Sequence, residues 1–279
     1  MAHDFAVSVI KGPRVDITPE NLLKEGRLDE AMQELAAQIR SRPADAKRRV
    51  FLFQLLSLLG QWERAQNQLK VAGELDPLNA LMVGAYAVAL AGELERVDVL
   101  EGKRAPLVIG EPAQWLALLL QALKLNSEGR HDAAATLRAQ AFDRAEPASG
   151  SIDGVPFEWI ADADPRFGPC LEIIIKGGYA WVPFSRIREL TFEAPTDLRD
   201  KVWAPVQITW SNGGQAIGFV PCRYPGAERS GDSEIVLARR TGWTDLGDDF
   251  YLGSGQRMLA TDAGEYPLLD VRTITFDVG

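Results

Sequence analysis

The sequence predicts an α+β protein in which a TPR-like array of helical hairpins is followed by a small, largely antiparallel β domain. The first half of the chain repeats itself at an offset of 34 residues, the period of tetratricopeptide repeats. The second half changes to short β-branched and aromatic runs separated by glycine-containing turns, and five of the seven tryptophans follow residue 150. We therefore expect a helical domain over 1–146, a linker over 147–155 and a β-rich domain over 156–279.

The 34-residue repeat places glycine, alanine and proline where a helical hairpin needs them. Glycine ends the first helix, alanine lets the paired helices approach closely, and proline stops the second helix. Thr18 and Pro19 predict where the first helix starts, through a side-chain cap and a first-turn proline. The aligned pairs are Leu22 and Leu56, Gly26 and Gly60, Leu28 and Trp62, Ala31 and Ala65, Leu35 and Leu69, and Pro43 and Pro77.

The later part of the helical half matches the 34-residue repeat less closely. Gly92 follows Gly60 by 32 residues, and Val97 stands where the small alanine would recur. The register therefore breaks between about 92 and 112, but 112–128 and 130–144 still have the apolar spacing of two paired helices. We expect a short, irregular array rather than a long solenoid.

The second half predicts β-hairpins after a polar stretch, 146–154, that is rich in Pro, Gly and Ser and typical of a linker. The strands alternate or are continuously apolar, and glycine turns separate them. The expected hairpins are 171–175 with 179–183, joined by a turn at 176–178, and 206–210 with 215–220, joined by 212–214; further strands are expected at 187–192, 234–237 and 271–276.

Charge and composition argue against several kinds of partner. The net charge of −9 opposes phosphate groups, so neither nucleic acid nor an anionic membrane is expected as a partner. The longest apolar stretch, 80–91, is too short to span a bilayer. Residues 1–11 contain no secretory signal, which makes the cytoplasm the expected location.

Few residues are suited to catalysis or to metal binding. His3 and His131 are the only histidines, so neither a histidine triad nor a multi-histidine metal site is expected. Cys170 and Cys222 lack the spacing of a zinc site and suggest buried thiols. The SxxK match at 8–11 is a chance match, because its companion motifs are absent. We expect no catalytic residues, no metal and no cofactor.

One carboxylate pair leaves an alternative open. Asp162 and Asp164 lie two residues apart and would project to the same side of an extended chain, as a carboxylate-dependent metal-binding enzyme requires. The competing interpretation is a turn, because Pro165 follows directly and aspartates organise turns through backbone hydrogen bonds.

Two other groups of residues could contact a partner. Lys47, Arg48 and Arg49 form a basic cluster at the front of a predicted helix, where a solvated face is the alternative to a binding site. The aromatic residues of the second half could line a groove, although most of them should form the core of the β domain with one or two partly exposed. They are Trp159, Tyr179, Trp181, Phe184, Trp203 and Trp210.

The second half also carries a specific series of motifs. It begins with the run Trp159 to Pro169 (WIADADPRFGP), followed by YAWVP at 179–183 and LRDKVWAP at 198–205. PCRYPG at 221–226, ARRTGW at 238–243 and GQRML at 255–259 complete the series. The series resembles the signature of the ImpE/TagJ family, also called SciE-type, of bacterial type VI secretion accessory proteins. The motif residues are Asp162, Asp164, Arg166, Gly168, Pro169, Trp181, Pro183, Arg199, Asp200, Trp203, Arg223, Tyr224, Trp243, Gln256 and Arg257; Ala180 departs from the pattern, which has a second aromatic there.

The resemblance implies a function that composition and spacing alone do not give. It implies a non-enzymatic cytoplasmic adaptor that binds the N-terminal helix of the small contractile-sheath subunit and modulates sheath assembly or disassembly. Stacked helical hairpins form a groove that can receive the apolar face of such a helix. We expect the helical domain to bind it through Lys47, Arg48 and Arg49; exposed aromatics of the β domain are the alternative.

Overall fold

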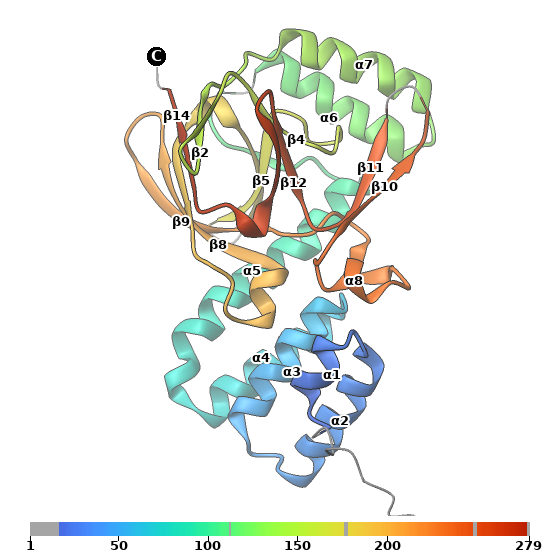
Figure 1. Cartoon of the computed structure of the whole chain (residues 1–279), viewed down its shortest axis with the longest axis vertical. Coiled ribbons are helices and arrows are strands. Elements are labelled where there is room, and N and C mark those ends of the chain that lie inside the picture. The colour runs from blue at the N-terminus through green and yellow to red at the C-terminus, as the bar shows by residue number, and fades with distance from the viewer. Residues whose placement is uncertain (1–16, 112, 176–177, 248–249, 278–279) are drawn as a thin grey trace, which may run out of the picture.

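The computed structural model describes residues 17–111, 113–175, 178–247 and 250–277. The predictions about 1–11 and about the turn residues 176–177 therefore lie outside the described residues. Helices form one end of the molecule, and sheets with a further helical pair form the other (Figure 1). The helices are α1 (Pro19–Lys24), α2 (Leu28–Ser41), α3 (Ala46–Leu58), α4 (Trp62–Leu75), α5 (Ala80–Leu100), α6 (Gln114–Ser127), α7 (His131–Arg144) and α8 (Ser233–Val236).

The predicted hairpin chemistry is confirmed in α1 to α4. The Thr18 hydroxyl accepts a hydrogen bond from the backbone N–H of Asn21 at 3.2 Å and caps α1. Gly26 and Gly60 have φ of 74° and 66°, the left-handed region in which a residue with a Cβ is strained. Ala31 and Ala65 are completely buried, as close helix packing requires. The local signals of the repeat therefore set the helix ends.

Helix α5 continues past Gly92, where the break in register was predicted to begin, and ends at Leu100. Gly92 does not end a helix; it lies in the middle of α5 against the sheet, where a Cβ would come 2.5 Å from Ile174 Cγ2. By length and composition, the segment 77–100 is long and apolar enough to cross a membrane. The sequence analysis had judged the apolar stretch 80–91 too short for this. Its Glu93 and Arg96 are nevertheless buried in contacts with the β part, so we interpret α5 as a core helix of a folded protein.

The strands form a nine-stranded sheet, a three-stranded sheet and a two-stranded ribbon. The order in the large sheet is β1-β6-β5-β9-β8-β7-β14-β2-β3, and its pairs are antiparallel except β1 with β6. Its strands are β1 (Leu107–Val108), β2 (Gly150–Ile152), β3 (Val155–Phe157), β5 (Cys170–Ile175), β6 (Gly178–Pro183), β7 (Ile187–Phe192), β8 (Trp203–Trp210), β9 (Gln215–Pro221) and β14 (Thr273–Phe276). The others are β4 (Ile160–Asp162), β12 (Met258–Thr261) and β13 (Gly264–Pro267), and the ribbon strands β10 (Thr241–Asp245) and β11 (Tyr251–Gly255).

Both faces of the central strands are covered, which explains why β5 is apolar except for the buried Glu172. Leu171 and Ile173 point into the core of the β part. Ile174 belongs instead to the cluster that continues into the helical array, and Gly92 of α5 contacts it. Strands buried on both faces have continuous rather than alternating hydrophobicity. The helical and β parts therefore share one hydrophobic cluster across the α5 face of the sheet.

Two sequence predictions require correction. The expected linker 147–155 contains strand β2 and the start of β3, with a turn at Asp153 and Gly154 that has positive φ at both residues. A Cβ on Gly150 would lie 1.9 Å from the Thr275 carbonyl oxygen, so this glycine permits strand pairing rather than flexibility. The expected strand 234–237 is mostly helix α8, because the Asp232 side chain caps it by accepting from the N–H of Glu234 at 2.8 Å.

Candidate functional site

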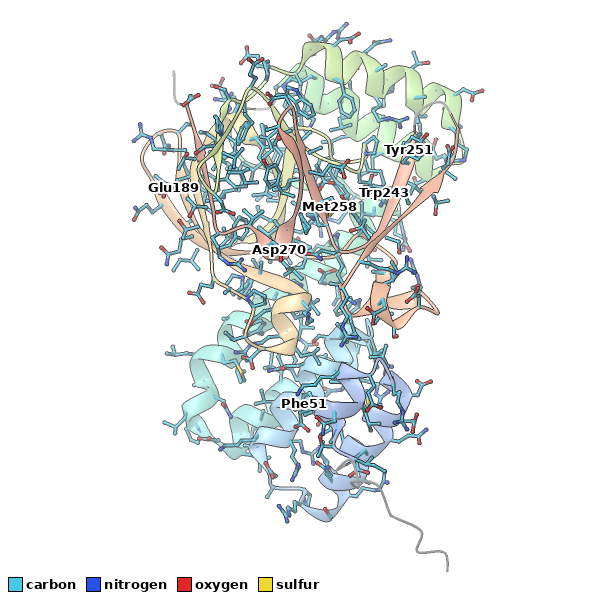
Figure 2. The ribbon with its side chains drawn as sticks, viewed as in Figure 1. Phe51, Glu189, Trp243, Tyr251, Met258 and Asp270 are labelled. Carbon is cyan, nitrogen blue, oxygen red and sulfur yellow. The ribbon has the colours of Figure 1, made fainter. Side chains whose placement is uncertain are left out.

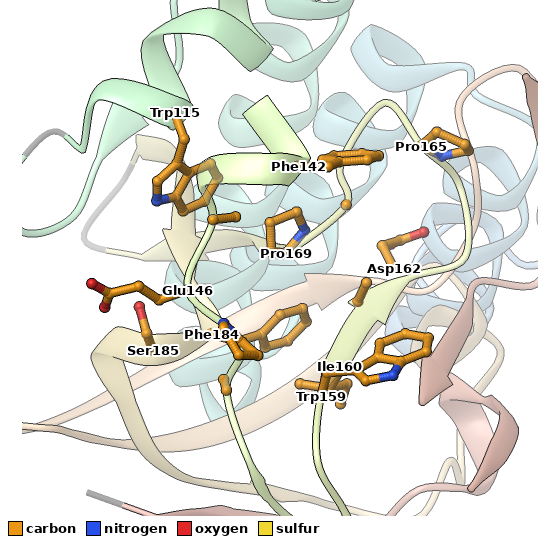
Figure 3. Close-up of a pocket in the computed structure, with 15 residues that line it drawn as sticks. Trp115, Phe142, Glu146, Trp159, Ile160, Asp162, Pro165, Pro169, Phe184 and Ser185 are labelled. Atoms are coloured by element: carbon orange, nitrogen blue, oxygen red, sulfur yellow. The ribbon is translucent and has the colours of Figure 1, made fainter. Parts of the chain in front are cut away.

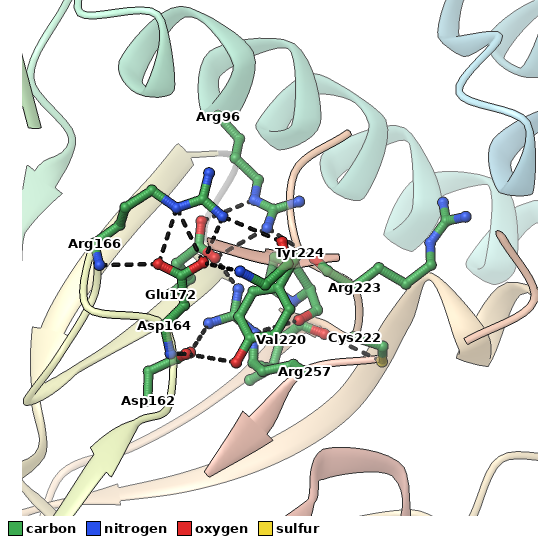
Figure 4. Close-up of polar contacts among 12 residues, drawn as sticks. Arg96, Asp162, Asp164, Arg166, Glu172, Val220, Cys222, Arg223, Tyr224 and Arg257 are labelled. Carbon is green, nitrogen blue, oxygen red and sulfur yellow. Dashed lines mark hydrogen bonds and ion pairs between the residues drawn. The ribbon is translucent and has the colours of Figure 1, made fainter. Parts of the chain in front are cut away.

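The motif residues of the β part gather around a buried ionic network, defined here as Arg96, Asp162, Glu172, Tyr224 and Arg257 (Figure 4). The guanidinium of Arg257 is completely buried. It donates to the Asp162 carboxylate from Nη1 and to the Glu172 carboxylate from Nη2. A buried charge that lacks a partner is strongly destabilising, so the pairing of these groups is a condition for the fold.

Helix α5 supplies the second cation of the network. Arg96 donates from Nε to Glu172 Oε1 at 2.8 Å and from Nη2 to Glu172 Oε2 at 3.0 Å. One turn earlier, Glu93 accepts a hydrogen bond from the indole N–H of Trp203 at 3.0 Å. These bonds attach α5 to the sheet and fix the helical array relative to the β part.

The Asp162–Asp164 pair forms a structured turn, as one of the two interpretations predicted. Asp162 Oδ1 accepts from the N–H of Asp164 at 2.8 Å and from the Tyr224 hydroxyl at 2.9 Å. The Asp164 carboxylate binds the Arg166 guanidinium, at 2.5 Å for the shortest contact, and the N–H of Gly253 at 2.8 Å. Both carboxylates are thus engaged by protein donors. Among the described residues, no group of three or more His, Cys, Asp or Glu side chains is arranged to hold a metal ion.

The two carboxylates of the network have pKa values shifted in opposite directions. Burial raises the pKa of Asp162 to about 6, although the Arg257 charge opposes this shift. Burial would also raise the pKa of Glu172, but the guanidinium groups of Arg96 and Arg257 outweigh it and lower that pKa to about 2. Glu172 is therefore the group that is held ionised by its partners.

Several other motif residues bond to backbone groups or pack in the core. Arg223 Nη1 donates to the carbonyl oxygens of Leu58 and Val236, both at 2.8 Å, and so ties the end of α3 to the β part. Gln256 donates to Ala238 O and accepts from the N–H of Leu269. Trp181, Pro183 and Trp203 are buried, while Trp243 is half-exposed against the Tyr224 ring. Most of the motif therefore holds the fold together.

A groove of about 910 Å³ lies on the concave face of the helical array. It is formed by α1, α3, the start of α5 and the β-part segment 195–201, which contains the short 3-10 helix Leu198–Lys201. Phe51 of α3, labelled in Figure 2, contributes to its apolar surface together with Met82 and Leu198. The successive first helices of the hairpins thus form a hollow, and the β part closes one side of it.

The groove is richer in cations than the rest of this acidic chain. Six basic and four acidic residues line it, and they include Lys47 and Arg48 of the predicted cluster and Arg199 of the motif series. Arg48 is paired with Asp45 at 3.1 Å, and Arg199 with Asp197 at 2.5 Å, with its guanidinium 4.7 Å from the centre of the Tyr86 ring. The pair of Arg48 is made by its Nε, which lies 3.1 Å from Asp45 Oδ2, and Arg199 Nε lies 3.9 Å from Asp200 Oδ1; neither contact has the geometry of a hydrogen bond.

The predicted basic cluster is divided between two faces of α3. Arg49 does not line the groove; its guanidinium donates to Pro43 O at 3.1 Å and to Gln68 of α4 at 2.9 Å. Asp200, next to Arg199, is turned away and accepts from the backbone N–H groups of Thr196 and Asp197. The sequence analysis missed Glu93, Arg96 and Met82, although a Glu and an Arg three residues apart in an apolar helix were a usable signal.

The aromatic residues lie mostly in the core, as predicted. Tyr179, Trp181, Phe184 and Trp203 are buried, and Trp210 is half-buried. Trp159 is the exception, because 41% of its surface is exposed.

Comparisons with known proteins agree with this architecture. Residues 154–275 match the family described as ImpE protein, and residues 22–88 match a tetratricopeptide-repeat family. The chain is 50% identical over 258 residues to the type VI secretion system accessory component TagJ of Pseudomonas aeruginosa PAO1. The aligned region covers 92% of this chain and 90% of that protein. Its fold is similar to the crystal structure of VPA1032 from Vibrio parahaemolyticus, with a TM-score of 0.84 and 25% identity over 93% of this chain and 97% of that one.

Proposed function

Since this chain belongs to the ImpE/TagJ family of type VI secretion accessory proteins, we propose that it is a non-enzymatic cytoplasmic adaptor of that system. Its partner is the N-terminal helix of the small contractile-sheath subunit, and by binding that helix it modulates sheath assembly or disassembly. The groove between the helical array and segment 195–201 is the binding surface.

The observation that carries this proposal is the pair of arginines in the groove. Arg48 comes from α3 and Arg199 from the β part, and both guanidinium groups line the groove while they pair with aspartates of their own segments, Asp45 and Asp197. An acidic side chain of a bound helix would form charge-assisted hydrogen bonds with these guanidinium groups.

The apolar residues of the groove support a helical partner. Leu23, Phe51, Met82 and Leu198 line the groove together with the charged residues, and an amphipathic helix presents both an apolar and a charged surface to such a groove. Burial of the apolar face would supply most of the binding free energy, whereas the charges would set register and on-rate.

The alternative, a metal-dependent enzyme using Asp162 and Asp164, has less support. Their carboxylates already bind Arg257, Tyr224 and Arg166. A divalent cation would have to displace these buried partners, which would leave at least one guanidinium unpaired in the core.

The test is a binding titration with the full-length chain. A fluorescent peptide with the sequence of the sheath subunit's N-terminal helix is titrated, and its anisotropy is followed at several salt concentrations. We expect Lys47→Glu and Arg48→Glu each to weaken binding about tenfold or more at low salt, and less at high salt.

Arg49→Glu is the matched control, because it makes the same charge reversal one residue away but outside the groove. Its affinity should stay close to that of the unmodified chain. If all three variants bind the peptide equally well, the groove is not the binding surface.

A further inference from the structure

The outer side of the α4–α5 pair carries the most exposed apolar side chains of the helical array. Leu78 and Leu81 have exposed fractions of 91% and 90%, the highest of any large hydrophobic residue that the structure describes. They come two residues before and one residue after Ala80, which lines a hollow of about 700 Å³ between the two helices. We call Leu78, Leu81 and the lining of this hollow the α4–α5 face. Contiguous exposed apolar surface of this kind marks interaction sites.

The hollow exists because the third hairpin of the array is incomplete. In a longer array a further helix would pack beside α5 and cover it, but α5 runs on to the sheet instead and ends there in bonds to Glu172. Small side chains keep the floor of the hollow low. Gly73 of α4 lies against Val83 of α5, where a Cβ would come 3.0 Å from Val83 Cγ2. The other small residues of the lining are Ala80, Gly84 and Ala87.

A second hollow shows by contrast how exposed this face is. It lies where the α6–α7 hairpin meets the β part, its volume is about 260 Å³, and the rings of Trp115, Phe142 and Trp159 surround it (Figure 3). These rings are at most 41% exposed, because elements of the same chain close on each other there. The leucines of the α4–α5 face have no such cover.

The α4–α5 face is electrically neutral, although the chain has a net charge of −9. Residues 77–92 contain no charged side chain. The two charged residues that line the hollow, Lys70 and Glu74, offset each other at 3.9 Å. Two copies of an acidic chain repel each other, and a neutral face is where that repulsion opposes contact least. The charge distribution therefore suits a second copy of this chain better than a strongly charged partner.

The apolar residues lie on two sides of α5, which decides the kind of occupant. Around the helix axis, Val83 lies about 60° from Ala80 on the side of α4, and Leu81 lies about 100° from Ala80 on the other side. One helix bound in the hollow would therefore leave Leu81 uncovered. A second copy related by a two-fold axis supplies two helices, so that its α5 fills the hollow and its α4 covers Leu81. Each copy gives the contact that it receives, as an isologous interface requires.

We propose that the α4–α5 face binds a second copy of this chain, and that α4 and α5 of the two copies form a four-helix bundle with the two α5 helices at its centre. Met82, which lines the groove, is about 200° around α5 from Ala80 and points away from this contact. The groove of each copy thus stays open. The inference rests on different residues from the groove, so it does not depend on the proposed function.

The size of the face predicts a weak dimer. The exposed segment 78–91 is about 20 Å long, and two helices side by side are about 20 Å wide, which gives a footprint of about 400 Å². Stable interfaces bury about 800 Å² on each partner, and smaller ones belong to weak complexes. We expect a dissociation constant of about 10–100 µM, so that the chain is a monomer below a few micromolar.

The test is sedimentation velocity of the full chain between about 1 and 300 µM, which spans the expected dissociation constant. The weight-average sedimentation coefficient should rise from the monomer value toward the dimer value. Leu81→Asp should weaken association about tenfold or more, because the interface would bury an unpaired carboxylate. Ala80→Gln, which fills the hollow without adding a charge, should weaken it about tenfold by steric overlap.

Ile217→Asp is the matched control. Ile217 is 75% exposed on β9, so this variant makes the same change of charge outside the α4–α5 face and should associate like the unmodified chain. Thermal unfolding of each variant, at a concentration where the chain is a monomer, checks that it is folded.

Three results would overturn the proposal. The first is a chain that stays monomeric over the whole range of concentration. The second is an equal loss of association in Leu81→Asp and Ile217→Asp, because the contact would then not be specific to this face. The third is co-flotation of the monomeric chain with phosphatidylcholine vesicles that Leu81→Asp abolishes, since the apolar segment 77–100 would then serve a membrane instead.

Discussion

The buried ionic network and the groove each combine one arginine of the motif series with one arginine of the helical array, but they use them differently. In the network, Arg257 lies completely buried between two carboxylates, and Arg96 covers the other side of Glu172. In the groove, Arg48 and Arg199 are only half-buried, and each pairs with a partly exposed aspartate, Asp45 or Asp197. Arginines that look equivalent in a sequence motif therefore divide into those that complete the fold and those that remain available to a partner.

The largest expected effect on stability comes from removing Arg257, the completely buried cation of the network. Arg257→Met leaves the buried carboxylates of Asp162 and Glu172 without their shared partner, and we expect it to lower the free energy of unfolding by about 3–5 kcal/mol. Denaturant unfolding followed by circular dichroism measures it. Arg188→Met, an exposed position on β7, should change stability by less than about 0.5 kcal/mol. A small effect at Arg257 would mean that the network does not hold the fold.

The next effect concerns pH. The pKa of Glu172 is lowered to about 2 from 4.5. The ionised carboxylate therefore stabilises the folded state by about 3 kcal/mol above pH 4.5, and this stabilisation is lost as pH falls toward 2. The stability difference between the unmodified chain and Glu172→Gln should narrow over that range. Asp162, with a pKa raised to about 6 from 3.8, acts in the opposite sense: it adds stability as pH falls from about 6 to 4. Asp162→Asn should remove that gain. Unfolding free energies measured from pH 7 downward test both signs.

A smaller effect compares two glycines of α5. Gly92→Ala would place a Cβ 2.5 Å from Ile174 Cγ2, and we expect a loss of about 1–3 kcal/mol from overpacking despite the better helix propensity of alanine. Gly84→Ala meets nothing within 4 Å and should stabilise by up to about 1 kcal/mol. Thermal unfolding of the two variants should therefore move in opposite directions. If both stabilise, the contact between α5 and the sheet is looser than the structure indicates.

The smallest effect on stability is expected in the groove. Lys47 is exposed, so Lys47→Ala should leave the free energy of unfolding within about 0.5 kcal/mol of its original value. Its affinity for the sheath-helix peptide should still fall severalfold at low salt, as measured by anisotropy. A destabilised Lys47→Ala variant would mean that the groove, like the network, is part of the fold's support.

Local signals in the sequence predicted much of the fold. Gly26, Gly60 and Thr18 act within one turn of the residues they affect, so their roles could be inferred from spacing. The network could not be inferred in this way, because Arg96 and Glu172 are 76 residues apart and meet only when α5 packs on β5. Gly92 was misinterpreted for the same reason: its partner, Ile174, is distant in the chain.

The candidate groove was predicted in part. Lys47 and Arg48 line it, but Arg49 does not, since successive residues of an α-helix are about 100° apart around its axis. Three consecutive residues therefore cannot share one face. The contribution of Arg199 was not assigned to the groove, because nothing local indicates that segment 195–201 lies beside α3.

Helix α5 has a mechanical consequence for an adaptor. It runs for about 30 Å in all, and about 21 Å of it separates Met82 in the groove from Arg96 in the buried network. A force on a helix bound in the groove would be transmitted along α5 to its bonds with Trp203 and Glu172. We therefore expect the molecule to respond to such a force as a rigid tether rather than as a hinge, a property that the proposed attachment to a contracting sheath would use.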